Sequence, residues 1–184
     1  MSNVIIVGDG PGGLGAALFL AKNGMSVTVY GENKTGMHWA YLYNYLGIKA
    51  ISGTDFQNVA REQVASFGTD LRETRVDTVE KDGENFVVTA HDGEKQTASY
   101  VILSEGKGAK FAKALGLAIS DDGVDVDRNG RTAIDRLYVV GRGTKMQRSQ
   151  AIISAGEGAA TALDILSIEK GEDFCDFDSP PKDE

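Results

Sequence analysis

The chain has 184 residues, enough for one domain with a core of its own, and a formal net charge of −8. Nucleic acid and anionic membranes both need a basic face, so neither partner is expected. The single cysteine, Cys175, excludes an intramolecular disulfide and a C-x-x-C redox pair within these residues. The apolar runs read as too short to span a bilayer and no signal-peptide core precedes the first strand, so the sequence predicts a cytoplasmic protein.

The N-terminal stretch joins a predicted buried strand to a glycine-rich turn and a helix. Residues Val4–Val7 are apolar and β-branched, as is typical of a strand buried on both faces. Gly8, Gly10 and Gly13 follow directly with G-x-G-x-x-G spacing, and residues 14–22 are good helix formers. A further predicted strand comes next, and this context indicates a dinucleotide site rather than a turn that only packs a helix on a sheet.

Each glycine of the motif has a separate expected role. Gly8 permits the tight turn, Gly10 leaves space for a pyrophosphate, and Gly13 lets the helix lie close to the sheet. The phosphates would bind the free N–H groups at the start of the helix, where Pro11 fits because a first-turn residue needs no donor.

An acid that binds a ribose hydroxyl is expected at the end of the second strand, Ser26–Tyr30. The candidate is Glu32, which stands one place late because Gly31 occupies the end of the strand. Either the glycine bends the chain so that Glu32 reaches the ribose, or Glu32 is a solvated loop residue. Lys34 is expected to be solvated as well.

The rest of the chain predicts one domain over residues 1–170, followed by an acidic tail, 171–184, that is expected to be mobile. An irregular aromatic stretch, 33–51, is followed by a helix, Thr54–Phe67, capped by Thr54 or Asp55. Strands 70–80, 85–90 and 96–104 form an antiparallel meander, and the last of them returns to the main sheet. Strands 124–127 and 136–141 and a helix, 150–168, complete the expected elements.

No metal site is expected. Asp125, Asp127 and Asn129 have the spacing of the first half of a calcium loop, but Arg136 stands where a bidentate Glu is needed.

Seven stretches fit a single pattern: V-I-I-V-G-D-G-P-G-G-L-G-A-A at 4–17, N-Y-L-G at 44–47, F-G-T-D at 67–70, Y-V-I-L-S-E-G at 100–106, N-G-R-T at 129–132, L-Y-V-V-G at 137–141 and Q-A-I-I-S-A-G-E-G-A-A at 150–160. Together these pieces cover nearly the whole chain, and in content and order they resemble one family, the thioredoxin-reductase type of FAD-dependent pyridine nucleotide-disulfide oxidoreductases. The last two pieces are the more specific, since the first is shared with many dinucleotide folds.

The resemblance implies an α/β fold: a Rossmann-like FAD/NAD(P)-binding domain with a mainly parallel sheet and a small antiparallel meander. It implies FAD as the cofactor in preference to NAD. The cofactor-binding residues that it suggests are Gly8, Gly10, Pro11, Gly12, Gly13, Glu32, Asn33, Asn44, Val76, Ser104, Glu105, Gly106, Gly141, Arg142, Gln150 and Ala151. Gln150 and Ala151 are expected at the flavin ring, where the helix dipole stabilises negative charge.

The chain also departs from the family pattern. The NADPH-binding domain that carries the redox C-x-x-C has no counterpart, because only a short segment separates the pieces that flank it. The chain is therefore similar to single-domain, thioredoxin-reductase-related proteins. Ser104-Glu105-Gly106 stands where the family has A-T-G, and Gly141-Arg142-Gly143 stands where the family has G-D. Arg142 is expected either to pair with a phosphate or to point to solvent.

The expected function is that of an FAD-dependent oxidoreductase without a redox disulfide of its own. Its electron donor is either free NAD(P)H or a partner protein, and no catalytic residue is assigned. His38 is the best candidate for an acid–base group, and the alternative is that it has a structural role. The rings from His38 to Tyr45 either stack on the cofactor or cover the site, or they form core or a partner surface. The missing domain is expected to leave the flavin edge or apolar surface exposed, and either this stretch or a second subunit would cover it, so we expect a homodimer. The alternative is a degenerate nucleotide-binding module that acts through protein–protein contact.

Overall fold

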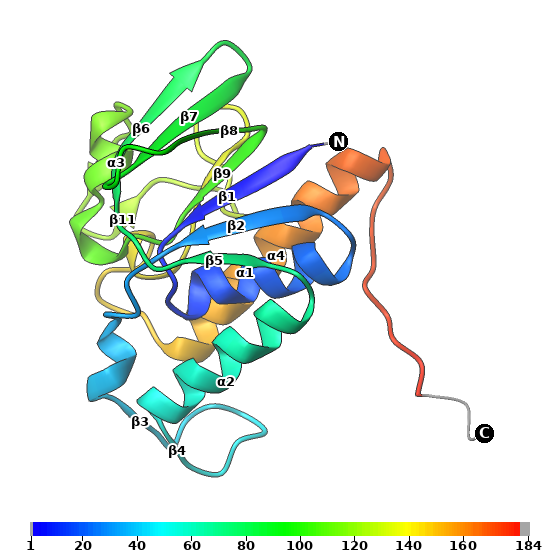
Figure 1. The fold of residues 1–184 in the computed structure, drawn as a ribbon. Coiled ribbons are helices and arrows are strands. Elements are labelled where there is room, and N and C mark those ends of the chain that lie inside the picture. Colours follow the sequence, from blue (N-terminus) through cyan, green and yellow to red (C-terminus); the bar gives the residue numbers. More distant parts are fainter. Residues whose placement is uncertain (1, 181–184) are drawn as a thin grey trace.

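The main sheet has five parallel strands with the first strand of the chain at its centre (Figure 1). In this computed structural model, which describes residues 2–180, the order across the sheet is β12 (Leu137–Val139), β9 (Tyr100–Leu103), β1 (Asn3–Val7), β2 (Ser26–Tyr30) and β5 (Asp70–Arg72). Every neighbouring pair is parallel. The predicted α/β fold class is confirmed, and β1 lies in the interior of the sheet as its apolar sequence requires.

Strand β1 is buried on both faces. Val4 and Ile6 pack into the core beneath the helices, whereas Ile5 and Val7 pack into a second core on the opposite face. All four side chains are at most 5% exposed. Each contributes about 1.5–3 kcal/mol by leaving water, and this explains why the strand is continuously apolar rather than alternating.

Three helices cover one face of the sheet: α1 (Pro11–Lys22), α2 (Gly53–Ser66) and α4 (Ala151–Lys170) (Figure 1). Helices α1 and α4 pack at backbone contact. A Cβ on Gly158 would lie 2.1 Å from the Gly12 carbonyl oxygen, and one on Gly15 would lie 2.6 Å from the Ala155 oxygen. The small residues of α4 therefore serve close helix packing.

The opposite face carries an antiparallel meander of β6 (Val76–Asp82), β7 (Asn85–Ala90) and β8 (Lys95–Ala98). The expectation of one strand over residues 70–80 was wrong, because β5 joins the main sheet beside β2 before β6 begins the meander. The strand expected over 96–104 is likewise divided into β8 and β9. The return of the chain to the main sheet, however, is as predicted.

The remaining described elements are short: η1 (Gly36–Trp39), β3 (Tyr41–Leu42), β4 (Ile51–Ser52), η2 (Gly106–Gly108), α3 (Lys110–Ala114), β10 (Ile119–Ser120), β11 (Gly123–Val124) and η3 (Gly141–Gly143). The strand expected over 124–127 pairs only at β11. The predicted cap of α2 was also wrong. Ser52 is the N-cap, and its Oγ accepts a hydrogen bond from the Asp55 N–H at 3.0 Å. Gly53 can follow because its missing Cβ leaves room for the Met37 carbonyl oxygen.

Helix α4 is long and apolar enough, by length and composition alone, to cross a membrane, contrary to the expectation that no apolar run reaches that length. Its buried side chains, however, pack in the core with α1 and β1. Its Asp164 carboxylate, 7% exposed, accepts hydrogen bonds from Tyr138 Oη at 2.8 Å and Arg131 Nε at 2.7 Å. Burial, followed by this hydrogen bond, raises the pKa of Tyr138 far above its usual range. These contacts are those of a core helix.

The C-terminal segment returns along the helices after α4 ends at Lys170. Phe174 packs against the helix-side core, and the Lys170 ammonium lies 3.6 Å from the centre of its ring. Lys22 of α1 forms an ion pair with Asp176 at 2.9 Å. Residues 181–184 of the predicted tail lie outside the described residues, and the division into one domain and a mobile tail remains a prediction.

Candidate functional site

A cavity of about 720 Å³ opens at the carboxyl ends of the parallel strands. Segments that follow β1, β2, β9 and β12 all reach it: Gly8–Gly12, Gly31–Glu32, Ser104–Gly106 and Gly141–Arg142. In open parallel sheets, ligands bind at this edge, where neighbouring strand connections leave in different directions. The topology alone therefore makes this cavity the candidate binding site.

The glycine motif forms the sharp turn between β1 and α1. Gly8 has φ +108°, and a Cβ there would lie 2.2 Å from the Ser104 carbonyl oxygen. Its N–H donates to the Tyr30 carbonyl at 2.8 Å. A Cβ on Gly13 would lie 2.0 Å from the Gly8 oxygen. Both predicted steric roles, the tight turn at Gly8 and the close approach at Gly13, are confirmed.

Gly10 differs from its neighbours because a Cβ there would meet no described atom within 4 Å. Its backbone is extended, with φ −77°, and it lines the cavity. In the described part of the chain no side chain caps α1, so the N–H groups of Gly12 and Gly13 at its first turn have no side-chain acceptor. This end of α1, where Gly12 lines the cavity, thus has free donors and the positive end of a helix dipole.

Asp9, inside the glycine motif, is a buried member of the cavity wall that the sequence reading did not single out. Its side chain is 6% exposed, and Oδ2 accepts hydrogen bonds from the Asn33 N–H at 2.9 Å and from Arg61 Nη1 at 2.6 Å. Gln57 Nε2 donates to the Asp9 carbonyl at 2.5 Å. Gln57 and Arg61 both come from α2, so this helix holds the glycine turn from the side.

Gly31 and Glu32 follow the end of β2. A Cβ on Gly31 would lie 2.2 Å from Asp9 Cγ, so the glycine makes room for the aspartate. Glu32 lines the cavity, but its side chain is 42% exposed and forms an ion pair with Lys34 at 3.0 Å. The two acids near β2 are therefore in different environments: Asp9 is fixed and buried, and Glu32 is at the rim.

Glu105 holds the segment after β9 to the following helix. Its two carboxylate oxygens accept from the backbone N–H groups of Phe111 at 2.9 Å and Ala112 at 3.0 Å. The side chain thus caps α3, while the backbone of residues 104–106 lines the cavity. The unusual glutamate at this position has a structural explanation in the capping contact.

The turn after β12 is held by Glu157 of α4. Its Oε2 accepts from the Gly141 N–H at 2.7 Å and from Thr144 Oγ1 at 3.2 Å, and its carboxylate also pairs with Lys145. Arg142, between the two glycines of this turn, is exposed at the cavity and has no ion pair or hydrogen bond among residues 2–180. Its charge is available to an anion.

The N-terminus of α4 closes the other end of the cavity. Gln150 and Ala151 line the wall there, and Gln150 Oε1 accepts a hydrogen bond from Asn44 Nδ2 at 3.0 Å. The predicted piece at residues 44–47 is therefore tied to the predicted piece at residues 150–160 although more than a hundred residues separate them.

Most of the residues suggested for the cofactor come together around this one cavity. Those that line the cavity are Gly8, Gly10, Pro11, Gly12, Glu32, Val76, Ser104, Glu105, Gly106, Gly141, Arg142, Gln150 and Ala151. Gly13, Asn33 and Asn44 are not part of the lining: Gly13 packs behind the turn, and the other two support residues that are. Among the lining residues that the suggested set omits are Asp9, Arg75 and Lys110.

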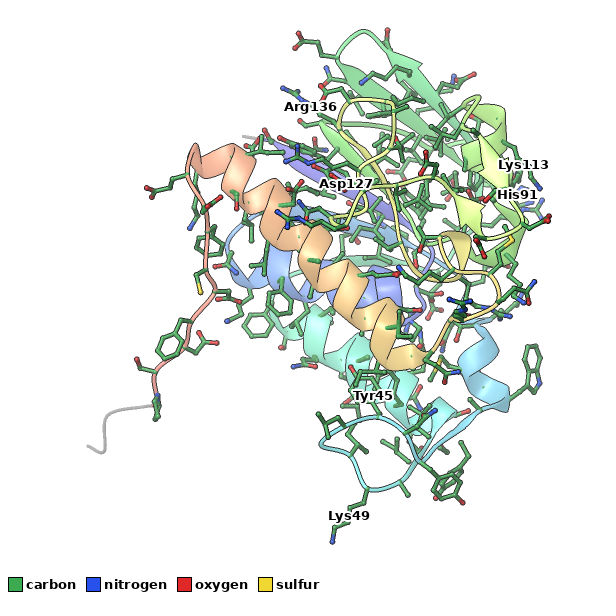
Figure 2. All side chains as sticks on the ribbon, turned by 180° about the vertical axis from the view of Figure 1, so that it is seen from behind. Tyr45, Lys49, His91, Lys113, Asp127 and Arg136 are labelled. Atoms are coloured by element: carbon green, nitrogen blue, oxygen red, sulfur yellow. The ribbon has the colours of Figure 1, made fainter. Side chains whose placement is uncertain are left out.

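The aromatic rings after β2 are not part of the cavity lining, and their contact with a ligand remains a prediction. Met37, Ala40 and Leu42 of the same stretch line it instead, because in this irregular segment the large rings point outward. Trp39 is 88% exposed. Tyr45 packs on Phe56 of α2 with ring centres 5.1 Å apart, and Figure 2 shows it beside the N-terminal end of α4.

His38 is held at both ring nitrogens. Nε2 lies 2.7 Å from the Asn33 carbonyl oxygen, to which it donates, and Nδ1 lies 3.0 Å from Thr54 Oγ1. The ring ties η1 to the start of α2 and is not part of the cavity lining. These contacts fit the structural role of His38, and an acid–base role remains untested.

Fold and site together define a nucleotide-binding α/β domain. The sequence profile described as "Pyridine nucleotide-disulphide oxidoreductase" matches residues 47–158, and the chain belongs to this family. The family membership predicted from the sequence is confirmed.

The chain is similar to curated reductases along part of their length. It is 34% identical over 117 residues to a thioredoxin reductase from Helicobacter pylori, in a match that covers 60% of this chain and 37% of that protein. It is 32% identical over 124 residues to a ferredoxin–NADP reductase from Thermus thermophilus, covering 62% of this chain and 37% of that protein. The matched part is thus little more than a third of the length of these relatives.

Solved structures share the fold at low sequence identity. An atypical thioredoxin reductase from Desulfovibrio vulgaris Hildenborough superposes with a TM-score of 0.84 at 18% identity, covering 94% of this chain and 99% of that one. A thioredoxin reductase from Gloeobacter violaceus gives a TM-score of 0.85 at 17% identity, with coverage of 97% and 98%.

Proposed function

We propose that the chain binds FAD in the cavity and acts as a cytoplasmic redox flavoprotein. The observation that carries the proposal is the open space at Gly10, in front of the free N–H groups that begin α1. A side chain at residue 10 would fill this space, and without one the space suits a pyrophosphate. Membership of an oxidoreductase family and the continuity of the cavity from Gly10 to the N-terminus of α4 support a ligand longer than a mononucleotide.

The residues of the chain would position the cofactor and supply local charge. The start of α1 would hold the pyrophosphate, and Arg142 and the start of α4 place positive charge farther along the same cavity. FAD, when bound, supplies hydride or one-electron transfer chemistry, and the surrounding protein contributes position and electrostatics. The chain as a whole is acidic, but the lining of the cavity has a net positive charge. An anionic ligand is therefore attracted to the cavity more than to the rest of the surface.

The proposed reaction does not include disulfide exchange within this chain. Its 184 residues contain one cysteine, Cys175, which is exposed in the C-terminal segment and is not part of the cavity lining. A dithiol that alternates with a disulfide needs two cysteines within reach of each other. We propose that electrons enter the flavin from a nicotinamide nucleotide in solution or from a partner protein, and that they leave it to an acceptor other than a disulfide of this chain.

The first prediction is that the purified protein takes up FAD and that the bound flavin can be reduced. The visible spectrum is recorded before and after adding FAD, and the complex is then mixed anaerobically with NADH, NADPH or dithionite. Loss of flavin absorbance with a nucleotide identifies that donor, and loss with dithionite alone points to a protein donor. A protein that takes up no FAD contradicts the proposal.

A second candidate function is a module that acts through protein contact, and the exposed aromatic surface favours it. Trp39, Tyr43 and Leu46 are 88%, 77% and 88% exposed, which is unusual for large apolar side chains on one short stretch.

We propose that this surface joins two copies of the chain. Light scattering should give a dimer that Trp39→Ser together with Tyr43→Ser converts to a monomer, and a monomeric wild-type protein would contradict the proposal.

A further inference from the structure

We propose that Asp9, not Glu32, binds a ribose hydroxyl of the adenosine half of the cofactor and excludes a 2′-phosphate there. The inference rests on the proposed binding of FAD and assigns a specificity role to an acid inside the glycine motif. In a dinucleotide fold this role is expected of an acid at the end of the second strand. Here Gly31 occupies that place.

The Asp9 carboxylate lies beside the end of β2, where the expected acid is missing. Asp9 Cγ is 2.2 Å from the position that a Cβ on Gly31 would take, and Oδ1 is 2.5 Å from it. The aspartate thus occupies the space that a side chain at residue 31 would enter. A carboxylate is present at the place where a ribose is expected, but it comes from the turn after β1.

One oxygen of this carboxylate remains available. Oδ2 is bound by the Asn33 N–H and by Arg61, whereas Oδ1 has no hydrogen bond within residues 2–180. Asp9 lines the cavity, and its Oδ1 is not fully buried. A carboxylate oxygen accepts from a hydroxyl, and a ribose hydroxyl is a donor.

The surroundings of Asp9 make an acid tolerable beside a pyrophosphate. Arg61 lies 2.6 Å away, its side chain only 13% exposed, and it balances the charge of the aspartate. Gln57 fixes the Asp9 backbone from the same helix. Glu32, in contrast, is at the rim and paired with Lys34, and that ion pair would have to open before Glu32 could bind a ribose.

An acid at this position also sets specificity. A ribose hydroxyl can donate to Oδ1, but a 2′-phosphate would bring negative charge against the carboxylate. Adenosine ligands without the phosphate, such as FAD and ADP, should therefore bind, and ligands that carry it should be rejected. Arg61 does not reverse this preference because its guanidinium is already engaged by Asp9 and by Glu73.

The test uses fragment probes and a matched pair of variants, Asp9→Asn and Glu32→Gln. Calorimetry compares ADP with 2′-deoxy-ADP and 3′-deoxy-ADP, and ADP-ribose with 2′-phospho-ADP-ribose. In the wild type and in Glu32→Gln we expect ADP to bind roughly ten- to a hundredfold more tightly than at least one deoxy analogue, as for a hydrogen bond to a charged group. In Asp9→Asn that ratio and the rejection of the 2′-phosphate should both shrink to within a few fold.

The outcomes separate this inference from the proposed function. If Glu32→Gln abolishes the discrimination, or if Asp9→Asn keeps it, the assignment to Asp9 is overturned while FAD binding stands. FAD binding without discrimination in the wild type overturns it as well. If the wild type binds neither FAD nor ADP, the proposed function fails first. Should Asp9→Asn fail to fold, the Glu32→Gln result alone still decides between the two acids.

Discussion

Replacing Gly158 with alanine is expected to lower the free energy of unfolding by about 3 kcal/mol or more. The added Cβ would lie 2.1 Å from the Gly12 carbonyl oxygen and 2.7 Å from the Ala16 nitrogen. Both are backbone atoms of α1, so neither can move aside as a flexible side chain would. Helices α1 and α4 must separate, and the apolar core beneath them loses contact.

The matched control is Gly156→Ala, two residues earlier on the same helix. A Cβ there meets no described atom within 4 Å, so the substitution should stabilise the helix by up to about 1 kcal/mol through the better propensity of alanine. Urea denaturation of both variants measures the difference in their free energies of unfolding, provided that the dependence of that free energy on urea concentration is the same for both. Equal stability of the two variants would show that the contact between α1 and α4 is looser than the structure indicates.

The turn that carries the candidate ligand site is the part of the fold that the sequence predicts best. The steric demands at Gly8 and Gly13 act within one strand–turn–helix unit, so their cause lies in neighbouring residues. The same holds for the apolar run of β1, whose burial on both faces follows from its composition. Features of this kind can be read locally because few other conformations satisfy them.

The contacts of Asp9 could not be read in this way. Its partners Asn33, Gln57 and Arg61 come from two segments much later in the chain, and only the fold brings them to the glycine turn. The only indication in the sequence was that an acid stands inside the glycine motif while a glycine stands at the end of β2, where an acid is expected. That signal has meaning only once the two strand ends are known to be adjacent.

The outward rings of the aromatic stretch and the cap formed by Glu105 show a second limit on what the sequence can predict, namely the direction of a side chain. The sequence left open whether the rings contact a ligand or form a core or partner surface, and the resemblance to the family implied that residues 104–106 bind the cofactor. In the structure Trp39 is exposed, and the Glu105 carboxylate binds N–H groups of α3 while the backbone of residues 104–106 lines the cavity. Direction depends on the path of an irregular backbone, and no periodic pattern encodes that path.

Replacing Gly10 with valine is expected to weaken FAD binding by two orders of magnitude or more while leaving the fold intact. The new side chain would occupy the open space in front of α1 and keep a pyrophosphate from the N–H groups of the first turn. Loss of two charge-assisted hydrogen bonds at about 1.5–3 kcal/mol each accounts for an effect of this size. Valine can adopt the backbone of Gly10, whose φ of −77° is an ordinary extended value.

The control for this variant is Gly156→Val, which introduces the same side chain into open space outside the cavity. Both variants should melt within a few degrees of the wild type, and only Gly10→Val should lose the quenching of flavin fluorescence on FAD titration. Because the two substitutions are chemically identical, a selective loss at Gly10 can arise only from its position at the cavity. If Gly10→Val binds FAD as tightly as Gly156→Val does, the pyrophosphate does not lie at the start of α1, and the cavity holds its ligand in some other way.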